Sequence, residues 1–128
     1  MATITHACGH TIETMNDTPA RRAKIEAAVC ASCVTAQAER DAAATITSYA
    51  ALPALTGSEK QVAWASSLRD EAVTLLRAGL VDAYRRCNSR ANPAEARAEI
   101  DAEIERVFAE TSAARWIDTR LQRRFSWS

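Results

Sequence analysis

The sequence predicts a mainly α-helical chain, in which a small N-terminal β-hairpin is followed by a helical body of about four helices. Two observations carry this fold class. Hydrophobic residues make up 48% of the 128 residues, but aromatic residues only 5%, and alanine is the commonest residue. Alanine favours close-packed helices, whereas a sheet would need more β-branched and aromatic side chains. In addition, apolar residues recur near the helical period of 3.6 from residue 58 onward.

Two pairs of metal-ligand residues stand in the first third of the chain. Cys8-Gly9-His10 is a C-x-H pair, and Cys30-Ala31-Ser32-Cys33 is a C-x-x-C pair. Three thiolates and one imidazole can close a tetrahedral shell around Zn²⁺ and leave no open coordination position. We therefore predict a structural zinc ion with four protein ligands, namely Cys8, His10, Cys30 and Cys33.

Other interpretations of these residues stay open. The thiols could be reduced and half-buried beside a surface histidine, or Cys30 and Cys33 could form a disulfide. A redox C-x-x-C is less favoured, because the sequence lacks the βαβ setting of such motifs. His6 could replace His10 as a ligand, but we expect it on the hairpin surface or next to the ligands.

The N-terminal elements follow from local signals. Residues 2–15 alternate loosely and predict a hairpin that presents the first ligand pair. Thr18 and Pro19 have the residue types of an N-cap and a first helical position. We expect a short helix from Ala20 to about Val29, with Ile25 and Val29 on one face, and an alanine-rich helix over 34–51 that ends before Pro53.

The helix that follows has the strongest periodicity in the chain. It begins at one of two capping boxes, Thr56–Glu59 or Ser58–Gln61. We expect Trp64 to pack against a neighbouring helix, and Gly79 to mark the close approach of another backbone. The predicted apolar stripe consists of Val62, Ala65, Leu68, Ala72, Leu75, Leu76, Leu80 and Tyr84.

Two further helices complete the predicted body. Asn92-Pro93 starts the first, whose buried seam is Ile100, Ile104, Val107 and Phe108. Thr111-Ser112 caps a short final helix that contains Trp116, Ile117 and Leu121. Together these signals divide the chain into a zinc-binding module at 1–36, a helical linker ending in a turn at 37–57 and a helical body at 58–128.

Charge and composition restrict the function. With 16 basic and 16 acidic residues the chain has no net charge, whereas dedicated nucleic-acid binders usually carry a basic excess. We find no signal peptide and no apolar run of the ~20 residues that span a bilayer, so we expect a cytoplasmic protein without a membrane partner. Cys87 is expected to be a packed thiol. The candidate partner contacts are Trp64, Arg85, Arg86, Arg120, Arg123 and Arg124.

The sequence also resembles a known family. The matching stretches are His6–His10, Arg22–Glu26, Cys30–Cys33, Leu55–Ala65 and Thr111–Arg120. They are similar to small proteins of phages, prophages and plasmids that join a zinc-ribbon-like segment to an L-T-G-S-E-K-Q-x-x-W-A helix. Here Ala31-Ser32 replaces the commoner proline–acidic pair, and the linker is shorter. The resemblance implies a mobile-element origin but no particular activity.

We therefore expect a non-catalytic protein that is stabilised by zinc and works through protein–protein contact. Inhibition of a host defence complex, as by an anti-CRISPR protein, would suit a mobile-element origin. The alternative is a nucleic-acid-binding accessory or regulatory protein of a mobile element. We do not expect an enzyme, because a catalytic zinc needs an open position and a general base. A homodimer stays open, since the central helix could pack within one chain or between two.

Overall fold

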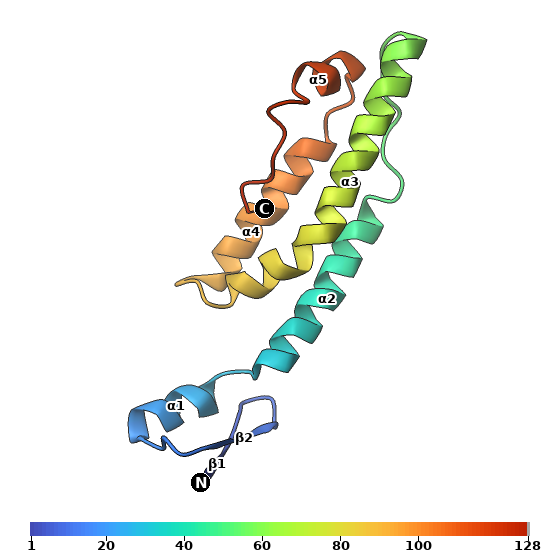
Figure 1. Ribbon diagram of the computed structural model, residues 1–128. Helices are drawn as coiled ribbons and strands as arrows, with labels where there is room; N and C mark the ends of the chain where they lie inside the picture. The colour runs from blue at the N-terminus through green and yellow to red at the C-terminus, as the bar shows by residue number, and fades with distance from the viewer. Residues whose placement is uncertain (128) are drawn as a thin grey trace. The chain divides into compact units, whose positions relative to one another are not determined.

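In the computed structural model, residues 1–127 are described and form two strands and five helices (Figure 1). The predicted fold class is confirmed, because a small hairpin precedes a mainly helical chain. Internal contacts divide the chain into two units, Met1–Ala38 and Glu39–Ser128. The division falls after Ala38, while the predicted module ended at residue 36. The last residue of the predicted helical body, Ser128, lies outside the described residues.

The first unit begins with the predicted hairpin. Strands β1 (Ala2–Thr5) and β2 (Thr11–Thr14) pair antiparallel, and Ile4 lies opposite Ile12. Ile4 is fully buried, so the hairpin has one apolar face turned inward. The loop between the strands carries the first pair of predicted metal ligands.

Helix α1 (Pro19–Ala27) starts as predicted but ends early. The Thr18 hydroxyl accepts the N-cap hydrogen bond from a backbone N–H in the first turn. At the other end Ala28 leaves the helical conformation, and its carbonyl instead accepts a hydrogen bond from the Ala7 N–H at 3.0 Å. Val29 therefore lies beyond the helix and is 46% exposed, so its predicted place on one helix face with Ile25 is wrong.

Helix α2 (Ala31–Ser48) starts three positions before the predicted Val34. The Val34 N–H donates to the Cys30 carbonyl at 3.0 Å, which places Cys33 in the first helical turn. The helix ends ahead of Pro53, as expected from the avoidance of helical angles before proline.

In the second unit, α3 (Glu59–Cys87) begins at the second of the two predicted caps. The Ser58 hydroxyl accepts a hydrogen bond from the Gln61 N–H at 3.2 Å, and the Gln61 side chain accepts one from the Ser58 N–H at 3.1 Å. This reciprocal pair satisfies two backbone donors that a helix start otherwise leaves without partners.

Helices α4 (Pro93–Phe108) and α5 (Ala113–Asp118) both pack against α3 (Figure 1). Their predicted caps, Asn92 and Ser112, are confirmed. Phe108 lies at the centre of an aromatic cluster, with its ring centroid 5.1–6.5 Å from the rings of Tyr49, Trp116 and Phe125. The largest fully buried side chains of this unit are Leu76, Leu80, Ile104 and Trp116.

The buried face of α3 is narrower than predicted. Leu75 is 55% exposed, although its neighbour Leu76 is fully buried. Successive residues are separated by about 100° around a helix, so the two leucines point in different directions. The prediction that Leu75 belongs to the buried stripe is wrong, because α4 and α5 cover only one side of α3. The buried residues of α3 are Ala65, Ala72, Leu76, Leu80, Ala83, Tyr84 and Cys87.

The C-terminal segment differs from prediction in two respects. Helix α5 ends at Asp118, and Leu121 is 85% exposed rather than part of a helix. The Arg123 side chain donates to the Trp116 carbonyl at 2.7 Å and so occupies an acceptor that a longer helix would use. The close neighbour of Gly79 is the Trp127 side chain and not, as predicted, the backbone of another segment. A Cβ at Gly79 would lie 2.9 Å from the Trp127 ring.

Candidate metal centre

The four predicted metal ligands come together in the first unit. Cys8 and His10 lie in the loop between β1 and β2, Cys30 lies just before α2, and Cys33 lies in its first turn. One ligand atom from each residue can be chosen so that all four lie within 4.8 Å of one another. Within residues 1–127 they make the one group of this kind, so the sequence spacing identified a real cluster.

The spacing of these atoms matches that of a tetrahedral site. The His10 Nδ1 atom lies 3.4 Å from the sulfur of Cys8, 3.5 Å from that of Cys30 and 3.2 Å from that of Cys33. With zinc–sulfur and zinc–nitrogen bonds of usual length, a tetrahedron places nitrogen about 3.6 Å from each sulfur. The arrangement could therefore hold a metal ion, with Nδ1 as the histidine donor.

The loop that carries the first pair is a tight turn. Gly9 has a φ of +91°, a backbone conformation that favours glycine. The turn is closed by two backbone hydrogen bonds, from the His6 N–H to the His10 carbonyl at 2.8 Å and from the Gly9 N–H to the His6 carbonyl at 2.9 Å. These bonds turn the chain so that Cys8 and His10 face the same point.

His6 lies next to the cluster and outside it. Its Nδ1 atom is 3.2 Å from the Ala28 carbonyl, at the end of α1. His6 thus fixes the ligand loop against the segment that leads to Cys30. The structure places His10, and not His6, among the four ligand atoms.

The thiols differ strongly in acidity. The Cys8 sulfur accepts a hydrogen bond from the Cys30 N–H at 3.4 Å, and this and the neighbouring His10 lower the pKa of Cys8 to about 5. Hydrogen bonding to the Cys30 sulfur, burial and the nearby sulfur charges raise the pKa of Cys33 to about 11. Without a cation, three adjacent sulfurs therefore resist full ionisation, whereas a bound metal would favour it.

Backbone groups complete the site, and sequence analysis did not include them. The Cys30 N–H donates to the Cys8 sulfur, and the Ala28 carbonyl contacts His6 and Ala7 of the ligand loop. Every residue has such groups, so no residue type signals their use. All four cysteines of the chain are free, and the alternative of a Cys30–Cys33 disulfide is not what the structure contains.

The predicted partner contact Trp64 is exposed. Its side chain is 49% accessible, and the Arg120 guanidinium lies over its ring at 5.0 Å from the centroid. The expectation that Trp64 packs between helices is wrong, because α4 and α5 cover the adjacent face of α3, which contains Ala65. Trp64 is therefore available to another molecule.

The arginines at the end of α3 are partly neutralised. Arg85 and Arg86 both form ion pairs with Asp82, at 2.5 and 3.1 Å. Arg86 also donates to the Trp127 carbonyl at 2.7 Å. Both lie in the last turn, where positive charge is favourable at the carbonyl end of a helix. Their positions thus have a structural explanation.

The C-terminal arginines differ among themselves. Arg120 donates to the Ile117 carbonyl at 2.6 Å, and Arg123 is half-buried over the ring of Trp116. Arg124 is exposed. Cys87 is buried, as predicted, and its thiol donates to the Ala83 carbonyl at 3.3 Å.

Comparisons with known proteins add no further assignment. The chain has no match among protein-family models, curated proteins or solved structures. Within residues 1–127, no helix combines the length and apolarity that crossing a membrane requires.

Proposed function

We propose that the four-residue cluster binds one zinc ion and that this ion has a structural role. The proposal rests on one observation, the convergence of three sulfurs and one imidazole nitrogen at tetrahedral distances. Thiolate and imidazole ligands suit Zn²⁺ better than Mg²⁺ or Ca²⁺, which prefer oxygen. Four protein ligands fill the tetrahedral shell and leave no position for a reacting water.

The protein then acts by binding and not by catalysis. A zinc hydrolase or deaminase would need an open coordination position beside a general base. Cys87, the thiol outside the cluster, is buried, and burial raises its pKa, which disfavours the nucleophilic thiolate. These properties support a scaffold that presents a surface.

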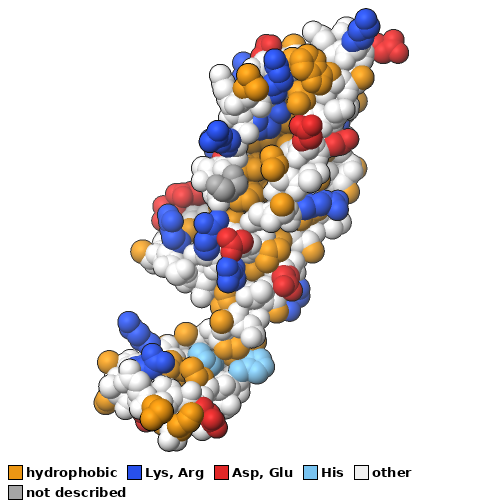
Figure 2. Space-filling view, in the orientation of Figure 1, with side chains coloured by type: hydrophobic (Ala, Val, Ile, Leu, Met, Phe, Trp, Pro, Cys, Tyr) orange, Lys and Arg blue, Asp and Glu red, His pale blue; other side chains and the backbone are white. Residues whose placement is uncertain are grey.

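The partner that we propose is a protein. The second unit exposes three large apolar side chains, Trp64, Leu75 and Leu121. Figure 2 shows apolar side chains among charges of both signs over this unit, without a continuous basic stripe on the visible face. Aromatic anchors of this kind are enriched at protein interfaces. The resemblance to phage and plasmid proteins supports a host defence complex, such as a CRISPR effector, as the partner class.

The zinc proposal is tested by metal analysis of purified protein. We expect one zinc per chain, a large loss of zinc in Cys30→Ser, and full zinc content in Cys87→Ser. The second variant is a matched control because it removes a thiol outside the cluster. If Cys87→Ser loses zinc or the wild type contains none, the ligand assignment fails.

The partner proposal is tested by affinity capture from a bacterial lysate with and without nuclease. We expect a protein that resists nuclease, binds the wild type and is lost with Trp64→Ser. Met15→Ser is the control, because Met15 is 88% exposed and lies in the other unit. Capture that disappears with nuclease would instead favour the nucleic-acid-binding alternative.

A further inference from the structure

A basic cavity of about 330 Å³ lies where the end of α4, α5 and the following segment meet. Its volume is at the small end of the range for ligand pockets. The chain as a whole has no net charge, but the residues that line this cavity are predominantly basic. It contains four arginines and one carboxylate, namely Arg106, Arg115, Arg123, Arg124 and Glu110.

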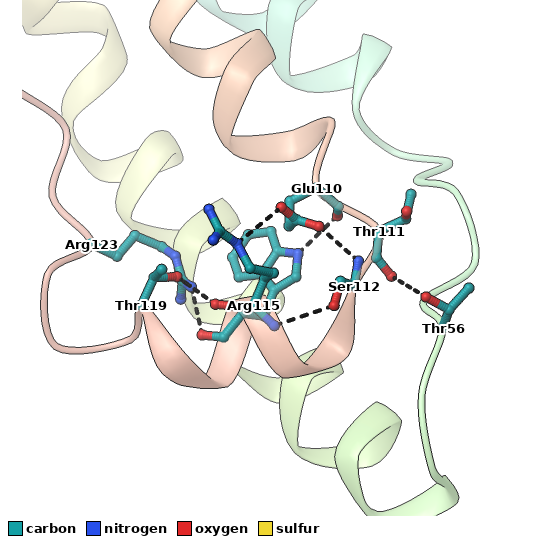
Figure 3. A network of polar contacts seen from close by, with 8 residues as sticks. Thr56, Glu110, Thr111, Ser112, Arg115, Thr119 and Arg123 are labelled. Carbon is teal, nitrogen blue, oxygen red and sulfur yellow. Dashed lines mark hydrogen bonds and ion pairs between the residues drawn. The ribbon is translucent and has the colours of Figure 1, made fainter.

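Arg123 is held in place without an ion pair to any carboxylate in residues 1–127. Its guanidinium donates to the Trp116 carbonyl at 2.7 Å and to the Thr119 hydroxyl at 2.8 Å, and it lies 4.0 Å from the centroid of the Trp116 ring. Figure 3 shows this side chain reaching back over α5. Within residues 1–127 no carboxylate forms an ion pair with it. The charge of Glu71 acts on it from beyond ion-pair distance, and burial has the larger effect on its pKa.

Glu110 does not neutralise the cavity. One of its carboxylate oxygens accepts a hydrogen bond from the Ser112 N–H at 2.9 Å, at the start of α5. The other lies 3.8 Å from Arg115 Nε, a long ion pair between a half-buried glutamate and an exposed arginine (Figure 3). The Glu110 charge is therefore shared between a helix start and one arginine.

The other two arginines are uncommitted within the described part of the chain. Arg106, on α4, and Arg124, after α5, are both exposed, and neither forms a hydrogen bond or ion pair there through its side chain. Their guanidinium groups can turn toward a ligand without breaking an existing contact. The cavity thus combines one positioned guanidinium with two uncommitted ones, from α4 and from the segment that also carries Arg123.

We propose that this cavity binds a phosphate group. Guanidinium groups recognise phosphate oxygens through paired, charge-assisted hydrogen bonds, and a multiply charged anion offsets several arginines at once. Burial lowers the pKa of Arg123, so an anion beside it would also relieve the cost of its desolvated charge. The phosphate comes either from a small molecule or from a nucleic-acid backbone, and the same groups would recognise it in both.

The test is calorimetric titration of the full chain with inorganic pyrophosphate at low ionic strength, where screening is weak. The double variant Arg106→Gln/Arg124→Gln removes two side chains that make no internal contact in residues 1–127, so it should fold normally. Arg21→Gln/Arg77→Gln is the control, because it removes the same charge from exposed positions outside the cavity. We expect the cavity variant to bind about tenfold more weakly or worse, and the control to stay within about twofold of the wild type.

A labelled oligonucleotide of mixed sequence separates the two sources of phosphate. Competition between oligonucleotide and pyrophosphate, with loss of both in the cavity variant, assigns the site to a nucleic-acid backbone. Pyrophosphate binding that the oligonucleotide does not disturb assigns it to a small phosphorylated molecule. The proposal is overturned if pyrophosphate does not bind, or if the control variant weakens binding as much as the cavity variant does.

Discussion

The hydroxyl group of Tyr84 joins three helices, and its removal is a sensitive test of how the second unit is held together. It donates to Asp101 Oδ1 on α4 at 2.5 Å and shares a hydrogen bond of 2.9 Å with the Thr45 hydroxyl on α2. The Arg97 guanidinium lies over the Tyr84 ring, 3.7 Å from its centroid. Arg97 in turn forms ion pairs with Asp41 and Asp101, at 2.9 and 3.3 Å.

The substitution Tyr84→Phe removes the hydroxyl and keeps the ring. A hydrogen bond to a charged group contributes about 1.5–3 kcal/mol. Tyr84 is 5% exposed, so water cannot easily replace the lost group. The Asp101 side chain, however, is 44% exposed and keeps its ion pair with Arg97, which limits the cost. We expect a loss of about 2 kcal/mol in the free energy of unfolding.

Urea unfolding followed by tryptophan fluorescence measures this loss. A change of about 2 kcal/mol should lower the urea midpoint by about 1 M, with an unchanged slope. Tyr49→Phe is the matched control, because the Tyr49 ring packs on Phe108 while its hydroxyl forms no hydrogen bond within residues 1–127. Its cost should stay below about 0.5 kcal/mol. Equal midpoints for the two variants would refute the reasoning.

Four further predictions follow. Burial raises the pKa of Tyr84 to about 12 from its ordinary 10.0, so its neutral form stabilises the fold below pH 10. We expect this contribution to decline as the pH rises from 10 toward 12. The difference between the urea midpoints of the wild type and of Tyr84→Phe should therefore shrink over this pH range. A zinc chelator should abolish hydrogen-exchange protection of the hairpin around Ile4 while α3 stays protected, because metal binding and folding of such modules are coupled. Trp64→Ala should lower the free energy of unfolding, measured in urea, by about 1–1.5 kcal/mol, whereas Trp116→Ala at the buried position should lower it by about 3–5 kcal/mol. Similar losses for the two variants would contradict the difference in exposure between the two tryptophans. Gly57 has a φ of +148°, and a Cβ there would lie 2.9 Å from the side-chain oxygen of Gln61 in the capping box. Gly57→Ala should therefore reduce the free energy of unfolding by about 1–3 kcal/mol, which a lower thermal midpoint would show.

Local signals in the sequence determined the hairpin, the capped helix starts and the two ligand pairs of the metal cluster. Thr18, Ser58 and Asn92 cap helices through atoms at most three residues away, so a short stretch of sequence contains the whole interaction. Cys8 and His10 likewise occupy a turn that closes within a few residues. Chelating pairs of this kind leave few geometries in which both ligands can bind one ion. Such features were predictable because their partners are neighbours in the chain.

The tertiary structure decided which surfaces are covered. Periodicity assigned Leu75 to the core, yet the packing of α4 and α5 left it exposed. Gly79 signalled a close approach, but only the fold brings the Trp127 ring to it. Arg106 and Arg124 are far apart in the sequence and share no motif. They line one cavity because the segment after α5 returns to the end of α4. Contacts between distant segments depend on how whole helices pack, and residue spacing within one helix does not contain that information.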